Sequence, residues 1–543
     1  MATTVAPELD PRTGAPPRRA GGDLLAGDRA LREALEREGA GDRLDALHAT
    51  GRTFADADAI DDGDACNRRT PEIVGEAEVA FDPSHHAIMR RAVEHGIAGA
   101  VWRDPSPGAH VARAAGFLML AQVEAGSTCP MAMTHSCVPA LRMDDEAAAF
   151  WEPLVSSGVY DPSERPAHEK QGALIGMALT EASGGSDLSG LTTVGAPQPD
   201  GSYLLTGEKW FVSAVQSDAF LVLARTASGI SCLLVPRLRE DGTPNGFRIT
   251  ALKDKLGNRS NPTAEVTLTD ARGTLLGEEG RGVAAIMRMI GGTRTDCVLG
   301  STAVMRLGLA EAIHHADHRP AFGRLLSDQP VMTAVLADLA LEYEAAVACA
   351  LWLVRLAERS RAGDAGAELV RRIAAPALKY WVCKRAPIHA GEGMECLGGF
   401  GYMEDSRLAR AYREAPLMSI WEGSGNVQAL DVLRAVERTP DVLDALLAEL
   451  DAAAGASASL DAATAGLRSL VADRERLVAD PRGLTQRIAL ALQAAVLVRG
   501  APPAIADAFC ATRLDAPPPA AFGVLPAGVD AAAIVARHRP EDR

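Results

Sequence analysis

The spacing of apolar residues along the 543-residue chain changes twice, and each change predicts a new domain. From about Asp23 to Trp151, segments such as GDLLAGDRALREALEREGA and GAHVARAAGFLMLAQVEAGS place apolar residues three and four positions apart. This spacing is typical of amphipathic helices. We therefore expect an N-terminal helical domain over residues 23–176, preceded by a disordered segment at residues 1–22 that contains prolines and charges early.

Residues 191–276 instead carry the signals of short β-strands. An Asp-Gly turn signal precedes an extended, aromatic-rich run, and DAFLVLART, ISCLLVPR and GFRITAL are short apolar runs bounded by turn residues. In AEVTLTD, polar residues alternate with Val266 and Leu268, as in a half-buried strand. We expect a small, largely antiparallel β-barrel or sandwich over residues 177–281.

Helical periodicity returns at Gly282 and predicts a bundle over residues 282–439. Gly/Pro-rich breaks separate four long segments, which are residues 282–318, 329–362, 366–397 and 405–437. Residues 440–543 are alanine-rich and lack lysine. They predict a helical C-terminal extension with an irregular, proline-rich end. The fold class is thus mainly α with a central β-barrel.

Composition narrows the class of protein. With 47% hydrophobic and 23% charged residues, the chain is typical of globular proteins. The formal net charge of −16 argues against attraction of the whole surface to DNA or anionic membranes, although it leaves room for a local basic patch. The nine cysteines are scattered, and no CxxC pair indicates zinc or thioredoxin-like chemistry. Dispersed thiols fit core residues in a reducing compartment, and no signal-peptide or membrane-span pattern is visible, so we expect a cytoplasmic protein.

The glycine-rich stretch MALTEASGGSDLSG at residues 177–190 carries the strongest local signal for chemistry. Exposed backbone amides beside the hydroxyls of Thr180 and Ser186 suit a pyrophosphate or an electron-rich heteroaromatic ring. The alternative is an ordinary loop between helix and sheet. The stretch is neither a dinucleotide-binding fingerprint nor a P-loop, because no GxGxxG links a strand to a helix.

Two further stretches combine aromatic residues with polar groups. In GEKWFVSA, Trp210 and Phe211 could provide a flat stacking wall, and strand alternation predicts that only one of them faces a given ligand. The alternative is one core and one surface aromatic residue. In HRPAFGRLLSDQPVM, Arg319 and Phe322 could bind a phosphate and an adenine ring, or could simply form a solvated turn.

Glu422 stands in MSIWEGSGNVQ, between apolar residues and small polar ones. A carboxylate is costly in a dry pocket unless it is paired or neutralised. The stretch therefore indicates either a functional carboxylate or a surface carboxylate at a helix end. His314 and His318 lie one helical turn apart, but no HExxH pattern accompanies them, so we predict an exposed helix face and no metal site.

Taken in order, these stretches resemble four signatures of the acyl-CoA dehydrogenase flavoproteins, from about residue 60 to residue 437. The matching segments are LTEASGGSD, Phe211-Val212-Ser213 in KWFVS, RPAFG, and LGGFGY followed by WEGSGN. The chain most resembles the AidB-type, alkylation-response (isovaleryl-CoA-dehydrogenase-like) branch, through QVEAGSTCPMAMT, KDKLGNRSN and SIWEGSGN. The resemblance implies an N-terminal helical domain, an antiparallel β-barrel and a C-terminal four-helix bundle.

The same resemblance implies FAD as the cofactor, with twelve residues that would bind it. Six would contact the isoalloxazine ring or the phosphates, with Ser213 near the reactive N5 edge; they are Leu179, Thr180, Ser186, Phe211, Val212 and Ser213. Three would reach the FAD of a neighbouring subunit, which implies a homotetramer; they are Arg319, Phe322 and Gln329. Three more would let backbone approach the cofactor or hold its adenine-side phosphates or ribose; they are Gly399, Ser424 and Asn426.

By the same resemblance, Glu422 would be the catalytic base that removes the α-proton of an acyl-CoA while the β-hydride leaves for flavin N5. Some family members place this base on an earlier bundle helix, where this chain has Thr293, which cannot serve. Trp421 replaces the tyrosine that is common in the family, which would narrow the acyl pocket and favour short or branched acyl-CoA substrates. An oxidase that uses O₂ would share the same residues.

The alternative function implied by the AidB-type branch is a DNA-associated alkylation-response flavoprotein with little or no dehydrogenase turnover. Its partner would be double-stranded DNA, which requires a basic surface. Residues 440–543 contain ten Arg, no Lys and thirteen Asp plus Glu, a net charge of 10 − 13 = −3, so the extension is not a basic domain. Arg434, Arg438 and Arg499 could still form a patch across subunits of an oligomer.

Overall fold

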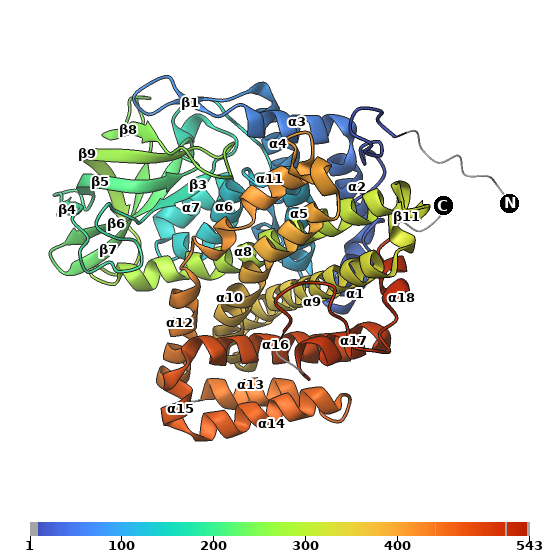
Figure 1. The fold of residues 1–543 in the computed structure, drawn as a ribbon. Coiled ribbons are helices and arrows are strands. Elements are labelled where there is room, and N and C mark those ends of the chain that lie inside the picture. The colour runs from blue at the N-terminus through green and yellow to red at the C-terminus, as the bar shows by residue number, and fades with distance from the viewer. Residues whose placement is uncertain (1–8, 440, 516–517, 540–543) are drawn as a thin grey trace. The chain divides into compact units, whose positions relative to one another are not determined.

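The computed structural model describes residues 9–439, 441–515 and 518–539 (Figure 1). The chain forms two compact units. The first contains the residues up to Asp56, residues 110–122 and the residues from Cys297 onward. The second contains residues 57–109 and 123–296. All nine cysteines are buried, as expected for small core residues.

The second unit contains the β-barrel, four complete α-helices and the N-terminal part of a fifth, α8 (Gly282–His318). The complete helices are α3 (Ala57–Arg68), α4 (Pro83–Glu94), α6 (Thr128–Leu141) and α7 (Asp145–Val155), and a short strand pair is formed by β1 (Glu72–Ile73) and β2 (Val79–Ala80). The barrel strands are β3 (Ile175–Ala178), β4 (Val194–Pro197), β5 (Tyr203–Ser213), β6 (Ala219–Thr226), β7 (Gly229–Pro236), β8 (Phe247–Leu252) and β9 (Thr263–Leu275).

The sheet closes on itself. Strands β6, β4, β5, β9 and β7 pair in that order, and β7 pairs back with β6. Strand β3 joins β6 in parallel, and β8 pairs with β9; the contacts of β6 with β3 and β4 are parallel and the other pairings are antiparallel. The predicted antiparallel barrel is confirmed. Alternation along β9 is also confirmed, because Val266 and Leu268 are buried while Glu265 and Thr267 are only partly buried.

The first unit is helical. Its elements before the extension are α1 (Arg29–Arg37), α2 (Leu44–Ala55), most of α5 (Ala109–Val123), the C-terminal part of α8 (Gly282–His318), α9 (Pro330–Arg361), α10 (Ala365–Glu395), α11 (Arg407–Glu414) and α12 (Gly425–Arg438), with a short hairpin of β10 (Pro320–Ala321) and β11 (Arg324–Leu325). Three of the four predicted long helices are confirmed. The fourth, expected over residues 405–437, is wrong, since Pro416 and Gly423 fall in a break that divides it into α11 and α12.

The C-terminal extension is packed against the bundle rather than loosely attached. It consists of α13 (Asp441–Asp451), α14 (Ala458–Ala472), α15 (Arg474–Ala479), α16 (Pro481–Gly500), α17 (Pro503–Arg513) and α18 (Ala531–Ala536), and Figure 1 shows α13 and α14 beside α16. Arg513 is fully buried and forms ion pairs with Asp338 and Glu342 on α9. Burying these charges is tolerable only because they are paired. The described part of the proline-rich segment, residues 518–530, forms neither helix nor strand, as predicted.

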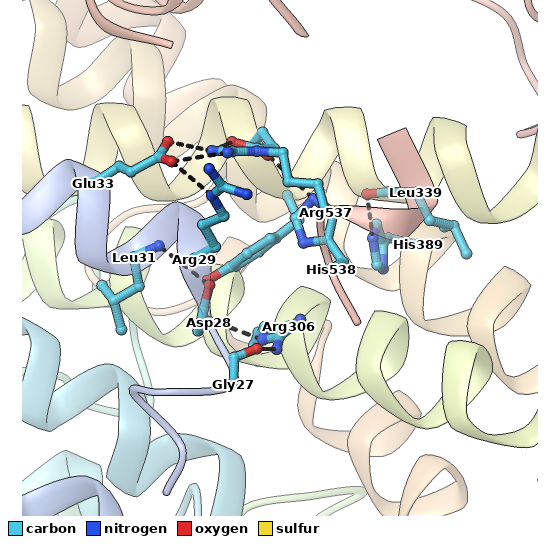
Figure 2. Close-up of polar contacts among 12 residues, drawn as sticks. Gly27, Asp28, Arg29, Leu31, Glu33, Arg306, Leu339, His389, Arg537 and His538 are labelled. Atoms are coloured by element: carbon cyan, nitrogen blue, oxygen red, sulfur yellow. Dashed lines mark hydrogen bonds and ion pairs between the residues drawn. The ribbon is translucent and has the colours of Figure 1, made fainter. Parts of the chain in front are cut away.

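Residues just after α18 are fixed to the same bundle by charged side chains (Figure 2). Arg537 forms ion pairs with Glu33 on α1 and with Glu344 on α9, and His538 Nε2 lies 3.2 Å from a Glu344 oxygen. Beneath them, the buried Asp28 caps the start of α1 and forms an ion pair with Arg306 on α8. First, last and central segments of the chain therefore meet in one charged network.

The N-terminal segment falls partly outside the described residues. Residues 1–8, part of the expected disordered region, are not described. Residues 9–22 form neither helix nor strand, yet Ala15 is buried and the Gly14 carbonyl accepts a hydrogen bond from Arg319. In the described part of the chain, no helix combines the length and the apolar character needed to cross a membrane.

Glu181 ties the glycine-rich loop to the barrel. Its buried carboxylate forms an ion pair with Lys209 Nζ at 2.9 Å and accepts hydrogen bonds from the N–H and hydroxyl groups of Thr192 and Thr193. Burial alone would raise the pKa of this carboxyl, but these hydrogen bonds lower it to about 2. Glu181 is therefore a structural carboxylate.

We expect Glu181→Gln to lower the free energy of unfolding at pH 7 by roughly 3–5 kcal/mol, because it leaves Lys209 buried without its carboxylate. Since the folded pKa of about 2 lies below the ordinary value of 4.5, the contribution of Glu181 is fully present above pH 4.5 and is lost as the pH falls toward 2. Urea unfolding followed by tryptophan fluorescence should therefore show a gap between wild type and variant that narrows in acid. The exposed Glu208 on the same strand provides the control, Glu208→Gln; a gap independent of pH would contradict the assignment.

Candidate functional site

The expected site residues fall into two sets, one in each unit. The set in the barrel unit begins with the glycine-rich loop, which is held against β5 because Trp210 N donates to Thr180 O at 2.9 Å. Glu181 and Gly184 exchange two backbone hydrogen bonds of 3.1 Å, which fold the loop into a tight turn. The structure thus brings Leu179 and Thr180 next to the aromatic strand, while Ser186 is exposed farther along the loop.

A β-bulge changes which side chains β5 presents. The register of β5 against β9 shifts between Lys209 and Val212, so both of these residues are buried while Trp210 and Phe211 are 38% and 48% exposed. The prediction that strand alternation places only one aromatic residue on a given face is wrong here, because the bulge inserts an extra residue. Lys253 Nζ lies 3.2 Å from the Trp210 ring centroid and 5.1 Å from that of Phe211, which places both rings on one side.

The bulge also limits what Val212 and Ser213 can do. Val212 belongs to the barrel core, so its side chain cannot line a cofactor and only its backbone remains available. Ser213 is partly buried, and its hydroxyl lies 3.2 Å from the Thr263 hydroxyl. A hydroxyl can donate one hydrogen bond and accept two, so this contact leaves Ser213 capacity for a further partner.

Two stretches that resemble the AidB-type branch meet in this unit. Glu124, buried, accepts hydrogen bonds from the backbone N–H of Gly126 at 2.8 Å, from the Ser260 hydroxyl at 2.8 Å and from the Asn67 amide at 2.9 Å. QVEAGSTCPMAMT and KDKLGNRSN are thus joined through one carboxylate. Thr293, at the alternative base position, is buried and its hydroxyl donates to the Ile290 carbonyl.

The set in the helical unit includes the hairpin of β10 and β11. Phe322, at the tip, is 96% exposed with a φ of +53°. A large apolar side chain in water on a left-handed backbone is unfavourable on both counts. Arg319 Nη1 donates to the Gly14 carbonyl at 2.7 Å, and Gln329 Nε2 donates to the Ala321 carbonyl at 3.1 Å. The three residues predicted to contact a neighbouring subunit are therefore adjacent, and the tip is fully accessible.

Glu422 lies in the break between α11 and α12. It is partly buried, and its φ of +58° is in the left-handed region that residues with a Cβ rarely adopt. Gly423 follows with a φ of +94°. Trp421, one residue earlier, packs against the buried side chains of Cys297, Cys383 and Met418. The packing of Trp421 before Glu422 and the positive φ angles of Glu422 and Gly423 together fix the direction in which the Glu422 side chain projects.

The small residues after Glu422 form the N-terminus of α12. Ser424 is its N-cap residue and is exposed, and Asn426 Oδ1 accepts a hydrogen bond from Arg482 Nη1 at 3.0 Å. A Cβ added at Gly425 would come within 2.8 Å of Lys384 Nζ. The positive end of a helix with two nearby cations suits a phosphate group. Gly399, in the turn Gly398–Tyr402, is exposed with open space on its Cβ side.

Four residues at these places were missed by reasoning from the sequence. Lys253 lies beside the two exposed aromatic rings, and Arg482 comes from the C-terminal extension. Lys379 and Gln428 hydrogen-bond the backbone of the Glu422 turn. Arg482, Lys379 and Gln428 lie in ordinary helix patterns with no local motif. Lys253 follows the end of β8, in a stretch that was noted only for its resemblance to the AidB-type branch.

The remaining candidate from the sequence is the histidine pair on α8, and both of these rings contact backbone carbonyl groups. His314 Nε2 lies 2.9 Å from the Pro17 carbonyl, and His318 Nδ1 lies 2.7 Å from the His314 carbonyl. These contacts give both rings a structural role at the end of α8.

Three family models match successive parts of the chain. They are the adaptive response protein AidB N-terminal domain over residues 15–162, the acyl-CoA dehydrogenase middle domain over residues 176–271, and the acyl-CoA dehydrogenase C-terminal domain over residues 280–437. The chain is 42% identical over 502 residues to the putative acyl-CoA dehydrogenase AidB of Escherichia coli (strain K12), an alignment that covers 91% of this chain and 92% of that protein.

Solved structures show the same fold. The crystal structure of Caenorhabditis elegans ACDH-11 in complex with C11-CoA has a TM-score of 0.81 at 25% identity, covering 97% of this chain and 92% of that one. An acyl-CoA dehydrogenase from Bacillus anthracis complexed with FAD has a TM-score of 0.61 at 18% identity, covering 84% and 82%. The predicted fold and family are thereby confirmed, and this chain belongs to the acyl-CoA dehydrogenase family, whose members bind FAD and act as oxidoreductases on CH–CH groups.

Proposed function

We propose that this protein is an FAD-dependent acyl-CoA dehydrogenase with Glu422 as its catalytic base and a short or branched acyl-CoA as its substrate. The observation that carries the proposal is the backbone of Glu422. This residue lies within the family's signature and has a strained, left-handed conformation. Strain of this kind costs about 1–3 kcal/mol and persists only where the surrounding structure imposes it. The C11-CoA complex of ACDH-11 supports an acyl-CoA as the class of substrate.

The residues present fit FAD. Two exposed aromatic rings beside the glycine-rich loop suit a flat ring system, and Phe211, Leu179 and Thr180 would contact it. Ser186 and the backbone amides of the loop would bind phosphate oxygens, while Ser424 and Asn426 would do so at the N-terminus of α12. The hydroxyl of Ser213 would hydrogen-bond the edge of the ring, and Val212 would contribute backbone alone.

The chemistry assigned to this chain is proton removal. Glu422 would accept the α-proton of the thioester, which leaves the electron pair on the α-carbon and allows the β-hydride to depart. FAD, when bound, supplies the acceptor for that hydride. Trp421, packed on its apolar neighbours, would close the pocket around a short acyl chain and exclude water from the carboxylate. A well-placed general base contributes about 10²–10⁴-fold to the rate.

We expect Glu422→Gln to slow anaerobic flavin reduction by acyl-CoA about 10²–10⁴-fold, because an amide cannot accept the α-proton. A panel of straight and branched acyl-CoAs, followed by loss of flavin absorbance, measures both the effect and the substrate preference. Glu437→Gln removes an exposed carboxylate from α12 and should leave the rate unchanged. Full activity of Glu422→Gln would remove Glu422 as the base, and no reduction of wild type by any acyl-CoA would refute the dehydrogenase proposal.

The proposed assembly is a homotetramer in which the hairpin of one subunit contacts the cofactor of another. The exposure of Phe322 at the hairpin tip supports this, since such a residue gains most by burial against a partner. We expect Phe322→Ala to reduce the tetramer fraction and the retained FAD together, as measured by light scattering and the ratio of flavin to protein absorbance. Loss of neither would contradict an intersubunit role for the hairpin. The exposed Tyr412→Ala on α11 serves as the control.

A second candidate function is association with double-stranded DNA, supported by the match to the AidB N-terminal domain and by the exposed Arg434 and Arg438 on α12. Arg499 contributes less, because it forms an ion pair with Glu449 at 2.5 Å. If DNA is bound, affinity for a short duplex should fall steeply with salt, and Arg434→Ala with Arg438→Ala should reduce the salt dependence by about one phosphate contact each. No binding at low salt would remove this candidate.

A further inference from the structure

The turn that carries Glu422 is held by two buried side chains from two different helices. Lys379 on α10 is 1% exposed, and its ammonium donates to the Trp421 carbonyl at 2.9 Å and to the Gly423 carbonyl at 2.8 Å. One cation thus bridges the carbonyl groups of Trp421 and Gly423, the residues on either side of Glu422. The span fixes the backbone from which the Glu422 side chain projects.

Gln428 on α12 completes the arrangement. Its side-chain amide, also 1% exposed, donates to the Glu422 carbonyl at 3.0 Å and to the Gly423 carbonyl at 2.9 Å. Three successive carbonyl groups of the turn, at residues 421–423, therefore accept hydrogen bonds from side chains. This is the external restraint that a non-glycine residue with a φ of +58° requires.

Burying the Lys379 ammonium costs more free energy than a purely structural role would require. A buried ammonium usually faces a carboxylate, and Lys209 and Lys170 in the barrel unit each do so. Among the described residues, Lys379 instead has only its two carbonyl partners and forms no ion pair. Desolvating an ammonium costs several kcal/mol, of which two carbonyl hydrogen bonds return only part. Methionine would fill a similar volume without that cost.

We propose that Lys379, together with Gln428, is a positioning residue that sets the placement of the Glu422 carboxylate for proton abstraction. The inference rests on the proposed function, because it concerns the same base. A reacting group must be held within about 0.5 Å, and a displacement of 1 Å can cost about 10²-fold in rate. Removing the Lys379 ammonium frees the carbonyl groups of Trp421 and Gly423, the residues on either side of Glu422, so the carboxylate loses its placement.

The test measures proton removal separately from hydride transfer. An acyl-CoA with sulfur in place of the β-methylene keeps its α-protons but offers no β-hydride, so exchange of its α-protons in D₂O, followed by NMR, reports the base alone. We expect Lys379→Met holoprotein to exchange these protons about 10- to 100-fold more slowly than wild type. Its dissociation constant for the same thioester, from calorimetry, should change less than threefold.

The matched control is Arg372→Met, which replaces another cation of α10 and breaks its ion pair with Asp431 on α12. This variant weakens the contact between α10 and α12 but keeps the hydrogen bonds of the Glu422 turn. It should therefore exchange the α-protons of the thioester at the wild-type rate. Exchange by Lys379→Met at the wild-type rate, or equal slowing by Arg372→Met, would overturn the proposal. If Lys379→Met does not fold, Gln428→Met must show the slowing, and a wild-type rate in that variant would overturn the proposal as well.

The proposed function is tested separately, by comparing the α-proton exchange rates of wild type and Glu422→Gln. If wild type exchanges α-protons and Glu422→Gln does not, Glu422 is the base whatever Lys379→Met does. If wild type and Glu422→Gln exchange equally, the base assignment fails before the Lys379 variant is compared. The two outcomes are thus separated by the wild-type and Glu422→Gln rates.

Discussion

The ammonium group of Lys379 bonds to the carbonyl groups of the residues on either side of Glu422, and the backbone conformation of that turn depends on this bridge. A left-handed backbone at a residue with a Cβ is held by its surroundings or it relaxes. Here the surroundings are α10, which supplies Lys379, and α12, which supplies Gln428. The packing of α10 and α12 therefore determines the backbone position from which the Glu422 side chain projects. The turn itself is the break between α11 and α12.

In the barrel, a β-bulge rather than side-chain hydrogen bonds determines how the candidate site residues are oriented. A regular strand would bury one of two neighbouring aromatic residues, but the bulge in β5 exposes both Trp210 and Phe211 on the side where Lys253 lies. Two exposed rings cost the isolated barrel some hydrophobic stabilisation, which a bound flat ring would restore. The ion pair of Glu181 with Lys209 anchors the glycine-rich loop beside these rings. One acidic residue of the signature thus serves the loop's shape rather than the reaction.

The sequence was sufficient for those features that follow from periodicity or from a contiguous motif. The barrel strands and three long bundle helices have such periodicity, and the motif around Glu422 marked that residue as a candidate. The bulge at Trp210, the division of the fourth helix and the role of Lys379 have no such signal. Each depends on which residues from distant segments pack together, and a lysine within a helical pattern reads the same whether it faces water or a carbonyl pair.

The C-terminal extension follows the same logic. Its ten arginines are outnumbered by thirteen acidic residues, and in the described part of the chain five of these arginines form ion pairs; they are Arg468, Arg499, Arg513, Arg537 and Arg539. Half of these arginines are therefore compensated within the fold, which lowers their contribution to long-range attraction of a polyanion. Arg482 differs, because its hydrogen bonds go to the neutral oxygens of Tyr380 and Asn426 beside the N-terminus of α12. The extension thus brings uncompensated positive charge to the place where the cofactor's phosphates are expected, which links its packing to the site rather than to a separate nucleic-acid surface.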